Sequence, residues 1–324
     1  MPDFAFATCR PGMEPALKLE VARTRPELRF AFSRPGIVTF KAPRELAPDD
    51  PPASAFARVW GRSIGAAGDP AAAAMQLGGV GATRVHVFAR DPEPAPGGEV
   101  DLAPWQVLGP GGPAAPGELV ADVIVAAGEP AWLGVHRHGP GRSPHPGGAF
   151  PVELPADAPS RAYAKIEEAI AWAELPVAAG QVALEIGAAP GGAVLALARR
   201  GLTVIGVDTG ALAPVVLALP GVTHLAKKVG AVRWEELPDV VDWLLVDVNL
   251  APQVALHEIA RLMPKLRPTL RGAVITLKMN DWKFVSELPR LVDRIRQLGL
   301  PDVRLRPLPS NRREVCAVAL PARG

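Results

Sequence analysis

The sequence predicts an α/β protein in which a doubly wound, Rossmann-like domain is preceded by a smaller α+β region. Three observations lead to this prediction. After Pro155, short and nearly continuously apolar strands alternate with amphipathic helical stretches, as in a parallel sheet that helices cover on both faces. A glycine-rich turn joins the first of these strands to the next helix. The first forty residues follow a β-α-β-β pattern instead, and a chain of 324 residues accommodates two or three compact domains.

In the C-terminal domain, expected at residues 151–324, strands and helices alternate regularly. Ser160 is expected to cap the first helix, because Tyr163, Ile166 and Ile170 recur at helical spacing. Strands are expected at 182–186, 203–207, 242–246, 273–277, 303–305 and 315–320, and further helices at 191–200, 253–266 and 282–298. Ligands of such sheets bind beyond the carboxyl ends of the strands, so we expect the active site at that edge.

The N-terminal half is expected to form two α+β subdomains, at residues 1–75 and 76–150. A helix is predicted at 14–23, and strands are predicted at 4–8, 28–32, 36–41, 56–60, 84–88, 120–125 and 132–136. Nothing in this half has the spacing of a catalytic motif.

The composition narrows the functional class. A formal net charge of +2 gives no global basic field, so any nucleic-acid surface has to be a local patch. Cys9 and Cys316 lie far apart and form no CxxC or Cys/His spacing, so we expect no disulfide framework or zinc site, and a cytoplasmic protein. The sequence shows no secretory signal and no stretch of about 18 uninterrupted apolar residues, so a membrane span is not expected.

The turn in VALEIGAAPGGAVLALARR indicates a nucleoside-containing cofactor. Gly187, Gly191 and Gly192 allow the backbone to turn tightly and to approach a ligand. Asp208 ends the next strand, where a carboxylate can accept hydrogen bonds from two ribose hydroxyls. The dinucleotide fingerprint GxGxxG is absent, and the GxxPGG turn with Pro190 does not offer the same amides to a pyrophosphate, which favours a nucleoside without phosphates. A plain tight β-to-α turn is the alternative.

Four ionisable residues are expected at the active edge of this sheet. Lys165 lies on the helix before the first strand, Asp247 and Lys278 end the strands WLLVD and AVITLK, and Glu314 begins the last strand. Each of them alone has the alternative of a solvated surface charge, but their combination with the cofactor turn indicates a site.

These motifs resemble a known family. SRAYAKIEEA, LEIGAAPGG, VDTG, LLVDV, ITLKM and REV, in this order, resemble the FtsJ-type ribose 2′-O-methyltransferases, which have a Lys-Asp-Lys-Glu tetrad. FPVELPADAPSRAYAKIEEA, CRPGMEP and FARVW resemble more specifically the RlmM-type enzymes that methylate a cytidine ribose in bacterial 23S ribosomal RNA. The resemblance implies a class I methyltransferase domain, S-adenosylmethionine as cofactor, and a THUMP-like, ferredoxin-like RNA-binding region in the N-terminal half.

The resemblance also implies roles for individual residues. Lys278 would be the general base, Lys165 and Glu314 would position it and the ribose hydroxyl, and Asp247 would orient Lys278 beside the sulfonium. The implied cofactor-binding residues are Gly187, Ala189, Pro190, Gly191, Gly192, Asp208 and Asp247. The predicted phosphate contacts are Arg312 and Arg313, with Lys227, Lys228 and Lys283 as further candidates.

Three positions depart from the family pattern. Ala193 replaces an aromatic residue after PGG, Val229 lies where an acidic residue would contact the adenine, and Ala162 replaces a serine. A catalytically weakened RNA-binding protein is therefore one alternative function, and a small-molecule O-methyltransferase is another.

Residues 137–150, RHGPGRSPHPGGAF, are interpreted as a flexible, solvated connector, with an RNA-contacting loop as the alternative. A metal site from His136, His138 and His145 is not expected, because no nearby Cys or carboxylate completes a coordination set. Neither a metal nor a membrane is expected among the partners, and ribosomal RNA is the predicted substrate.

Overall fold

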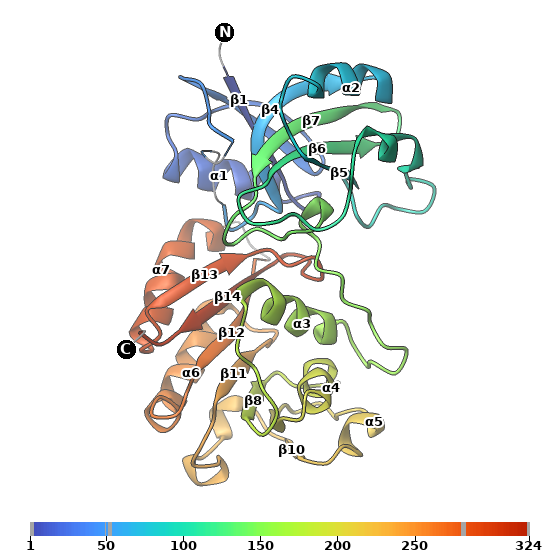
Figure 1. The fold of residues 1–324 in the computed structure, drawn as a ribbon. Coiled ribbons are helices and arrows are strands. Elements are labelled where there is room, and N and C mark those ends of the chain that lie inside the picture. Colours follow the sequence, from blue (N-terminus) through green and yellow to red (C-terminus); the bar gives the residue numbers. More distant parts are fainter. Residues whose placement is uncertain (1–2, 49, 51–53, 280–282, 323–324) are drawn as a thin grey trace. The chain divides into compact units, whose positions relative to one another are not determined.

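The protein consists of two compact units, Met1–Phe150 and Pro151–Gly324, in a computed structural model that describes residues 3–48, 50, 54–279 and 283–322 (Figure 1). The division between them coincides with the boundary expected from the sequence. Each unit contains a seven-stranded sheet. None of the helices in the described ranges is long and apolar enough to cross a membrane.

The sheet of the C-terminal unit has the strand order β10-β9-β8-β11-β12-β14-β13. Its members are β8 (Val182–Ile186), β9 (Thr203–Val207), β10 (Val222–Leu225), β11 (Trp243–Val246), β12 (Gly272–Lys278), β13 (Asp302–Arg306) and β14 (Glu314–Leu320). The five strands from β10 to β12 are parallel, whereas β14 pairs antiparallel with both β12 and β13. The chain leaves β8 in one direction through β9 and β10 and returns to its other side at β11, so the topological switch point lies between β8 and β11.

Helices cover both faces of this sheet (Figure 1). On one side, α3 (Ala162–Ala173) packs against α4 (Gly192–Arg199), and their apolar residues share a core with β8, β9 and β14. On the other side, α6 (Pro252–Leu266) packs against α7 (Lys283–Gln297). The short α5 (Pro214–Leu217) lies between β9 and β10 along the chain. A sheet buried on both faces explains why its central strands are apolar at nearly every position.

The N-terminal unit has a single sheet in the order β2-β3-β1-β4-β7-β6-β5. Its strands are β1 (Asp3–Thr8), β2 (Arg29–Arg34), β3 (Ile37–Ala42), β4 (Val59–Ala67), β5 (Arg84–Ala89), β6 (Leu119–Ala126) and β7 (Glu129–Arg137), and its helices are α1 (Glu14–Thr24) and α2 (Pro70–Leu77). The subdomain boundary expected near residue 75 falls within this sheet, since β4 pairs with β7. Residues on either side of that boundary therefore share one set of backbone hydrogen bonds.

Several expected elements differ in detail. The strand expected at 56–60 begins only at Val59 and runs to Ala67, while Phe56 is buried in a turn before it. Helix α2 and strand β10 were not predicted. Helix α2 is rich in alanine and therefore lacks a wide stripe of large apolar residues. Its N-cap is Asp69, whose side chain accepts a hydrogen bond from the Ala72 amide. Strand β10 has only four residues.

Two helix starts also bear on the sequence predictions. Helix α3 begins at Ala162 with Arg161 at the N-cap position, so Ser160 is one residue too early, although its Oγ accepts a weak 3.3 Å hydrogen bond from the Ala162 amide. The start expected at Trp282 lies outside the described residues.

The segment 137–150 is packed against the N-terminal unit rather than solvated. Arg58 donates to the carbonyl of Gly147 at 2.7 Å, and the Ala114 amide donates to that of Pro144 at 2.7 Å. The Arg142 guanidinium lies 4.2 Å from the centre of the Trp60 ring. The interpretation as a flexible connector is therefore wrong, because its glycines and prolines serve close packing here instead of mobility.

Candidate active site

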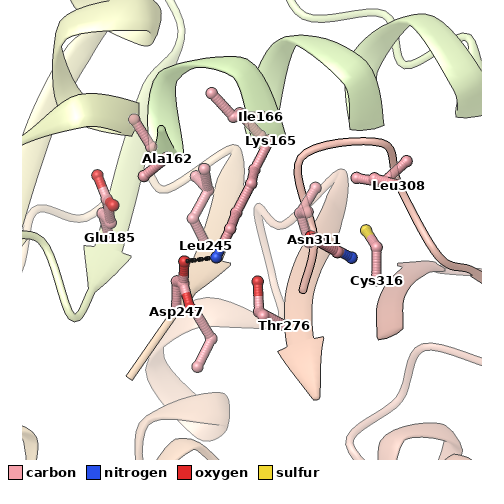
Figure 2. A pocket seen from close by; sticks show the side chains of 13 residues that line it. Ala162, Lys165, Ile166, Glu185, Leu245, Asp247, Thr276, Leu308, Asn311 and Cys316 are labelled. Atoms are coloured by element: carbon pink, nitrogen blue, oxygen red, sulfur yellow. Dashed lines mark hydrogen bonds and ion pairs between the residues drawn. The ribbon is translucent and has the colours of Figure 1, made fainter. Parts of the chain in front are cut away.

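The four ionisable residues singled out in the sequence come together at the carboxyl edge of the C-terminal sheet. Asp247 directly follows β11, next to the switch point, and Lys278 is the last residue of β12. Glu314 is the first residue of β14 and lies directly opposite Lys278 in the antiparallel register of these two strands. Lys165 reaches the same place from α3 (Figure 2).

These side chains form a closed ring in which lysines and carboxylates alternate. Lys278 Nζ lies 2.7 Å from Asp247 Oδ1 and 2.6 Å from Glu314 Oε1. Lys165 Nζ lies 2.9 Å from Asp247 Oδ2 and 2.7 Å from Glu314 Oε2. All four side chains are between 13% and 21% exposed, so water screens these pairs only in part.

The ring shifts the pKa of two of its members. Burial by itself lowers the pKa of Lys278, but attraction and hydrogen bonds from Asp247 and Glu314 outweigh it and raise the pKa. Burial raises the pKa of Asp247, and the two lysines more than reverse this effect, so that it ends below its usual value. The ring thus holds Lys278 as an ammonium and Asp247 as a carboxylate.

The glycine-rich turn after β8 lies at the switch point. A Cβ on Gly187 would come within 2.4 Å of the carbonyl oxygen of Asp247, and one on Gly192 within 2.3 Å of Ser160 Oγ. The turn therefore passes close to the end of β11 at Gly187 and to the start of α3 at Gly192, and neither position has room for a side chain. Gly191, at φ +109, precedes the first residue of α4, and the Ala189–Pro190 peptide bond is cis.

Asp208 follows β9 and turns back towards this loop. Its Oδ2 accepts a 3.1 Å hydrogen bond from the Ala189 amide, and its Oδ1 accepts a 2.8 Å bond from the Gly210 amide. The sequence predicted a ribose acceptor here. In addition, the structure gives Asp208 a role in joining the loops that follow β8 and β9.

The sequence prediction missed Glu185, within LEIGAAPGG. This β8 residue is only 2% exposed, and its Oε2 has no hydrogen-bond partner. Burial raises its pKa well above the usual value, and the charges of Asp247 and Asp208 add to the rise. Three carboxyl groups thus meet at the switch point, an arrangement that suits a cationic ligand. The signal was a glutamate within an otherwise apolar strand.

A small pocket opens beside Lys165 and Asp247 (Figure 2). Two of its lining residues, Ala162 and Ala193, are positions that depart from the family pattern, and their small side chains leave this space open. Thr276 and Asn311 also line it. The third departure, Val229, begins a short 3₁₀ turn after β10, and its carbonyl accepts from Arg261 at 2.7 Å.

The loop between β13 and β14 is held over the site by a residue that the sequence prediction also missed. Glu168, one turn after Lys165 on α3, is 3% exposed and accepts hydrogen bonds from the amide and hydroxyl of Ser310, at 3.0 and 2.7 Å. The Met279 amide donates to the Arg313 carbonyl at 2.7 Å. These bonds anchor the loop at its middle and at its last residue, immediately before Glu314.

The predicted phosphate contacts differ in their surroundings. Arg312 and Arg313 are both exposed in the loop that precedes Glu314. Lys228 is exposed, whereas Lys227 forms an ion pair with Glu236. The side chain of Lys283 lies outside the described residues.

The chain is similar in sequence to ribosomal RNA methyltransferases. Ribosomal RNA large subunit methyltransferase M of Halorhodospira halophila is 38% identical over 160 residues, which cover 48% of this chain and 45% of that protein. The protein of the same name from Thauera aminoaromatica is 33% identical over 211 residues, covering 61% and 56%. The resemblance inferred from the motifs is thereby confirmed, and the chain spans about half the length of the curated relatives it matches. No family model matches the sequence.

Among solved structures, TrmN from Thermus thermophilus aligns with 98% of this chain and 99% of its own, at 15% identity and a TM-score of 0.38. This TM-score is too low to support a conclusion.

Proposed function

We propose that the protein transfers a methyl group from S-adenosylmethionine to the ribose 2′-hydroxyl of a nucleotide in ribosomal RNA. The observation on which this rests is the closed Lys165–Asp247–Lys278–Glu314 ring beside a glycine-lined turn. The similarity to large-subunit methyltransferases directs the proposal to large-subunit RNA. A cytidine is the proposed target because the sequence motifs resemble those of enzymes that methylate a cytidine ribose, and the cytoplasm is the proposed compartment.

The residues at the switch point fit a cationic nucleoside cofactor. Gly187 allows a ligand to approach the backbone, and Asp208 supplies a carboxylate for ribose hydroxyls. Asp247 supplies negative charge, and a nearby cation would lower the raised pKa of Glu185 and so favour its ionised form. When bound, S-adenosylmethionine supplies an electrophilic methyl group on a sulfonium.

The ring positions the nucleophile and receives its proton. A ribose hydroxyl is a weak nucleophile at neutral pH, so it has to be held in line and relieved of its proton as the new bond forms. Lys278 Nζ accepts this proton, which requires the neutral amine. The pKa of Lys278 falls when the sulfonium adds a further positive charge near Asp247. The Asp247 carboxylate is then shared between more cations and stabilises the Lys278 ammonium less. Lys165 and Glu314 hold Lys278 and the hydroxyl in place.

RNA binding is assigned to both units. Arg312 and Arg313 are the proposed phosphate contacts next to the reacting groups. In the N-terminal unit, proposed to be THUMP-like, a groove is lined by the Phe32 ring, which stacks on Trp132, and by Arg34, which lies 4.8 Å from the centre of the Phe32 ring. Aromatic and guanidinium planes of this kind are typical of surfaces that bind unpaired bases.

The alternative of an RNA-binding protein without turnover is less well supported. Such a protein has no need for two lysines between two carboxylates at a glycine-lined turn, and these ion pairs are costly to desolvate.

The test is methyl transfer from radiolabelled S-adenosylmethionine to unmodified ribosomal RNA. We expect incorporation at a ribose 2′-oxygen. We also expect the Lys278→Ala variant to lose about 10²- to 10⁴-fold in rate while it binds the cofactor nearly as well as the wild type.

Lys265→Ala is the matched control, because Lys265 lies on α6 in an ion pair with Asp239. Cofactor binding without any RNA methylation would refute the proposed substrate, and the absence of cofactor binding would favour the alternative without turnover.

A further inference from the structure

Three histidines and one aspartate lie on one face of the N-terminal sheet. His86 and Asp122 are direct partners across the parallel strands β5 and β6. Val120 is opposite His136 in the antiparallel pair of β6 and β7, and Asp122 is two residues beyond Val120. Side chains of direct partners, and of residues two apart along a strand, point to the same face. The strand register alone therefore brings His86, Asp122 and His136 together.

The three side chains are close and fully enclosed. One ring nitrogen of His86, one of His136 and a carboxylate oxygen of Asp122 all lie within 4.8 Å of one another. His136 Nδ1 is 2.5 Å from Asp122 Oδ2. The residues are 2%, 3% and 0% exposed, in the order His86, His136, Asp122.

One carboxylate oxygen in this group has no partner. Asp122 Oδ1 is buried and makes no hydrogen bond with any of the residues that the structure describes. An unsatisfied oxygen on a buried carboxylate destabilises the fold, because the charge has lost its hydration without gaining a partner. One hydrogen bond to His136 does not satisfy this carboxylate, whereas coordination to a cation would.

A fourth candidate donor is a histidine of the packed segment 137–150, which lies beside the three residues whose ligand atoms are within 4.8 Å of one another. His138 continues the pairing of β7 with β6, because its amide donates to the Glu118 carbonyl at 2.8 Å, and it lies two residues after His136 on the same face. Its Nδ1 is buried without a hydrogen-bond partner.

We propose that His86, Asp122 and His136, with His138 as the fourth ligand, form a structural site for a divalent transition metal ion, for which Zn²⁺ is the best match. Imidazole nitrogens with one carboxylate suit Zn²⁺, and a set of four protein ligands with no exposed position is typical of a structural rather than a catalytic site. The ion would tie β5, β6 and β7 to the segment that leads into the C-terminal unit. This site is independent of the proposed methyl transfer.

The site also revises an expectation from the sequence. The histidines near 136–145 were expected to lack a carboxylate, because none is a near neighbour along the chain. Asp122 is 14 residues before His136 and reaches it through strand pairing.

The experiment uses the full-length protein, stripped with a chelator and then titrated with Zn²⁺. We expect one ion per chain by elemental analysis after dialysis, and a melting temperature higher with Zn²⁺ than in chelator. Co²⁺ as a probe should give the visible absorption bands of a four-coordinate site. His86→Ala and Asp122→Asn should lose the stoichiometric ion and the Zn²⁺-dependent rise in melting temperature. His257→Ala, which alters an exposed histidine on α6, should retain both.

The measurement on the wild type decides the question even if a variant fails to fold. A wild-type protein that binds less than about 0.1 ion per chain and melts at the same temperature with Zn²⁺ as in chelator would overturn the proposal. The group would then be a hydrogen-bonded His–Asp pair only. Stoichiometric Zn²⁺ retained in folded His86→Ala and Asp122→Asn would place the ion elsewhere and overturn it equally.

Discussion

At the scale of single residues, Lys278 poses the main chemical question, because its pKa is raised while its proposed role requires the neutral amine. Burial lowers this pKa, but Asp247 and Glu314 raise it above the ordinary 10.5. The ion pairs of Lys278 therefore stabilise the fold fully below the unfolded pKa, and this contribution is lost as the pH rises through the folded value.

We expect the rate of methyl transfer under single-turnover conditions to increase with pH, approaching tenfold per unit between about pH 6 and about pH 9. The physical reason is that only the neutral fraction of Lys278 can accept the proton. Rates measured on one RNA substrate across this range test it, with Glu314→Gln as the comparison, since the loss of one carboxylate should lower the pKa of Lys278 and move the rise to lower pH. A flat profile in both proteins would exclude Lys278 as the base.

Asp208 should act on cofactor binding rather than on chemistry. Its carboxylate receives the Ala189 and Gly210 amides and is the proposed acceptor for ribose hydroxyls. Because a hydrogen bond to a charged group contributes about 1.5–3 kcal/mol, Asp208→Ala should weaken S-adenosylmethionine binding by roughly tenfold or more. Calorimetric titration of the wild type, Asp208→Ala and the exposed-site control Asp239→Ala measures this. An equal loss of cofactor affinity in Lys278→Ala would contradict the separation of the two roles.

Among the elements, the loop between β13 and β14 joins the proposed RNA contacts to the ring. Glu168 anchors Ser310, and Arg312 and Arg313 are exposed in the same loop just before Glu314. A loop anchored at Ser310 and at the Arg313 carbonyl would present these two cations at a constant distance from Lys278 and Glu314.

Replacement of Arg312 and Arg313 by Ala should weaken RNA binding. It should also reduce the slope of the logarithm of the binding constant against the logarithm of the salt concentration, by about one unit per lost phosphate contact. Filter binding or fluorescence anisotropy over a range of salt concentrations measures the slope. Arg296→Ala is a suitable control, because Arg296 pairs with Asp293 at the end of α7. An unchanged slope in the double variant would remove both arginines from the RNA surface.

At the scale of the whole molecule, the division at residue 150 separates two sheets with separate cores. All residues of the ring and of the glycine-rich turn lie in the C-terminal unit. The aromatic groove with Phe32 and Trp132 lies in the N-terminal unit.

We expect a fragment of residues 151–324 to bind S-adenosylmethionine with nearly the affinity of the full chain but to bind ribosomal RNA at least about tenfold more weakly. The physical reason is that the fragment lacks the proposed RNA contacts of the N-terminal unit, which would contribute to the affinity for the same RNA molecule. Circular dichroism checks that the fragment is folded, and parallel titrations with cofactor and RNA give the two affinities. Undiminished RNA affinity of a folded fragment would confine RNA binding to the C-terminal unit.

The parts of the molecule that depend on local pattern follow from the amino-acid sequence alone. The strands and helices of the C-terminal unit, apart from the short α5 and β10, follow from the pattern of apolar residues. The glycine-rich turn likewise indicated the close backbone approach that requires Gly187 and Gly192. Lys278 and Glu314 could be singled out because each stands at the end of an apolar strand, where a parallel-type sheet presents its active edge.

Features that depend on contacts between distant segments could be found only from the fold. The closure of the ring and the direction of the pKa shift of Lys278 are set by strand register and by the approach of α3, and neither leaves a periodic signal in the sequence. The same holds for Glu185, whose pKa is raised first by burial and then by the charges of Asp247 and Asp208. Asp122 meets His86 and His136 only because three strands pair in one register. The local sequence pattern does not contain this register and therefore could not predict the cluster.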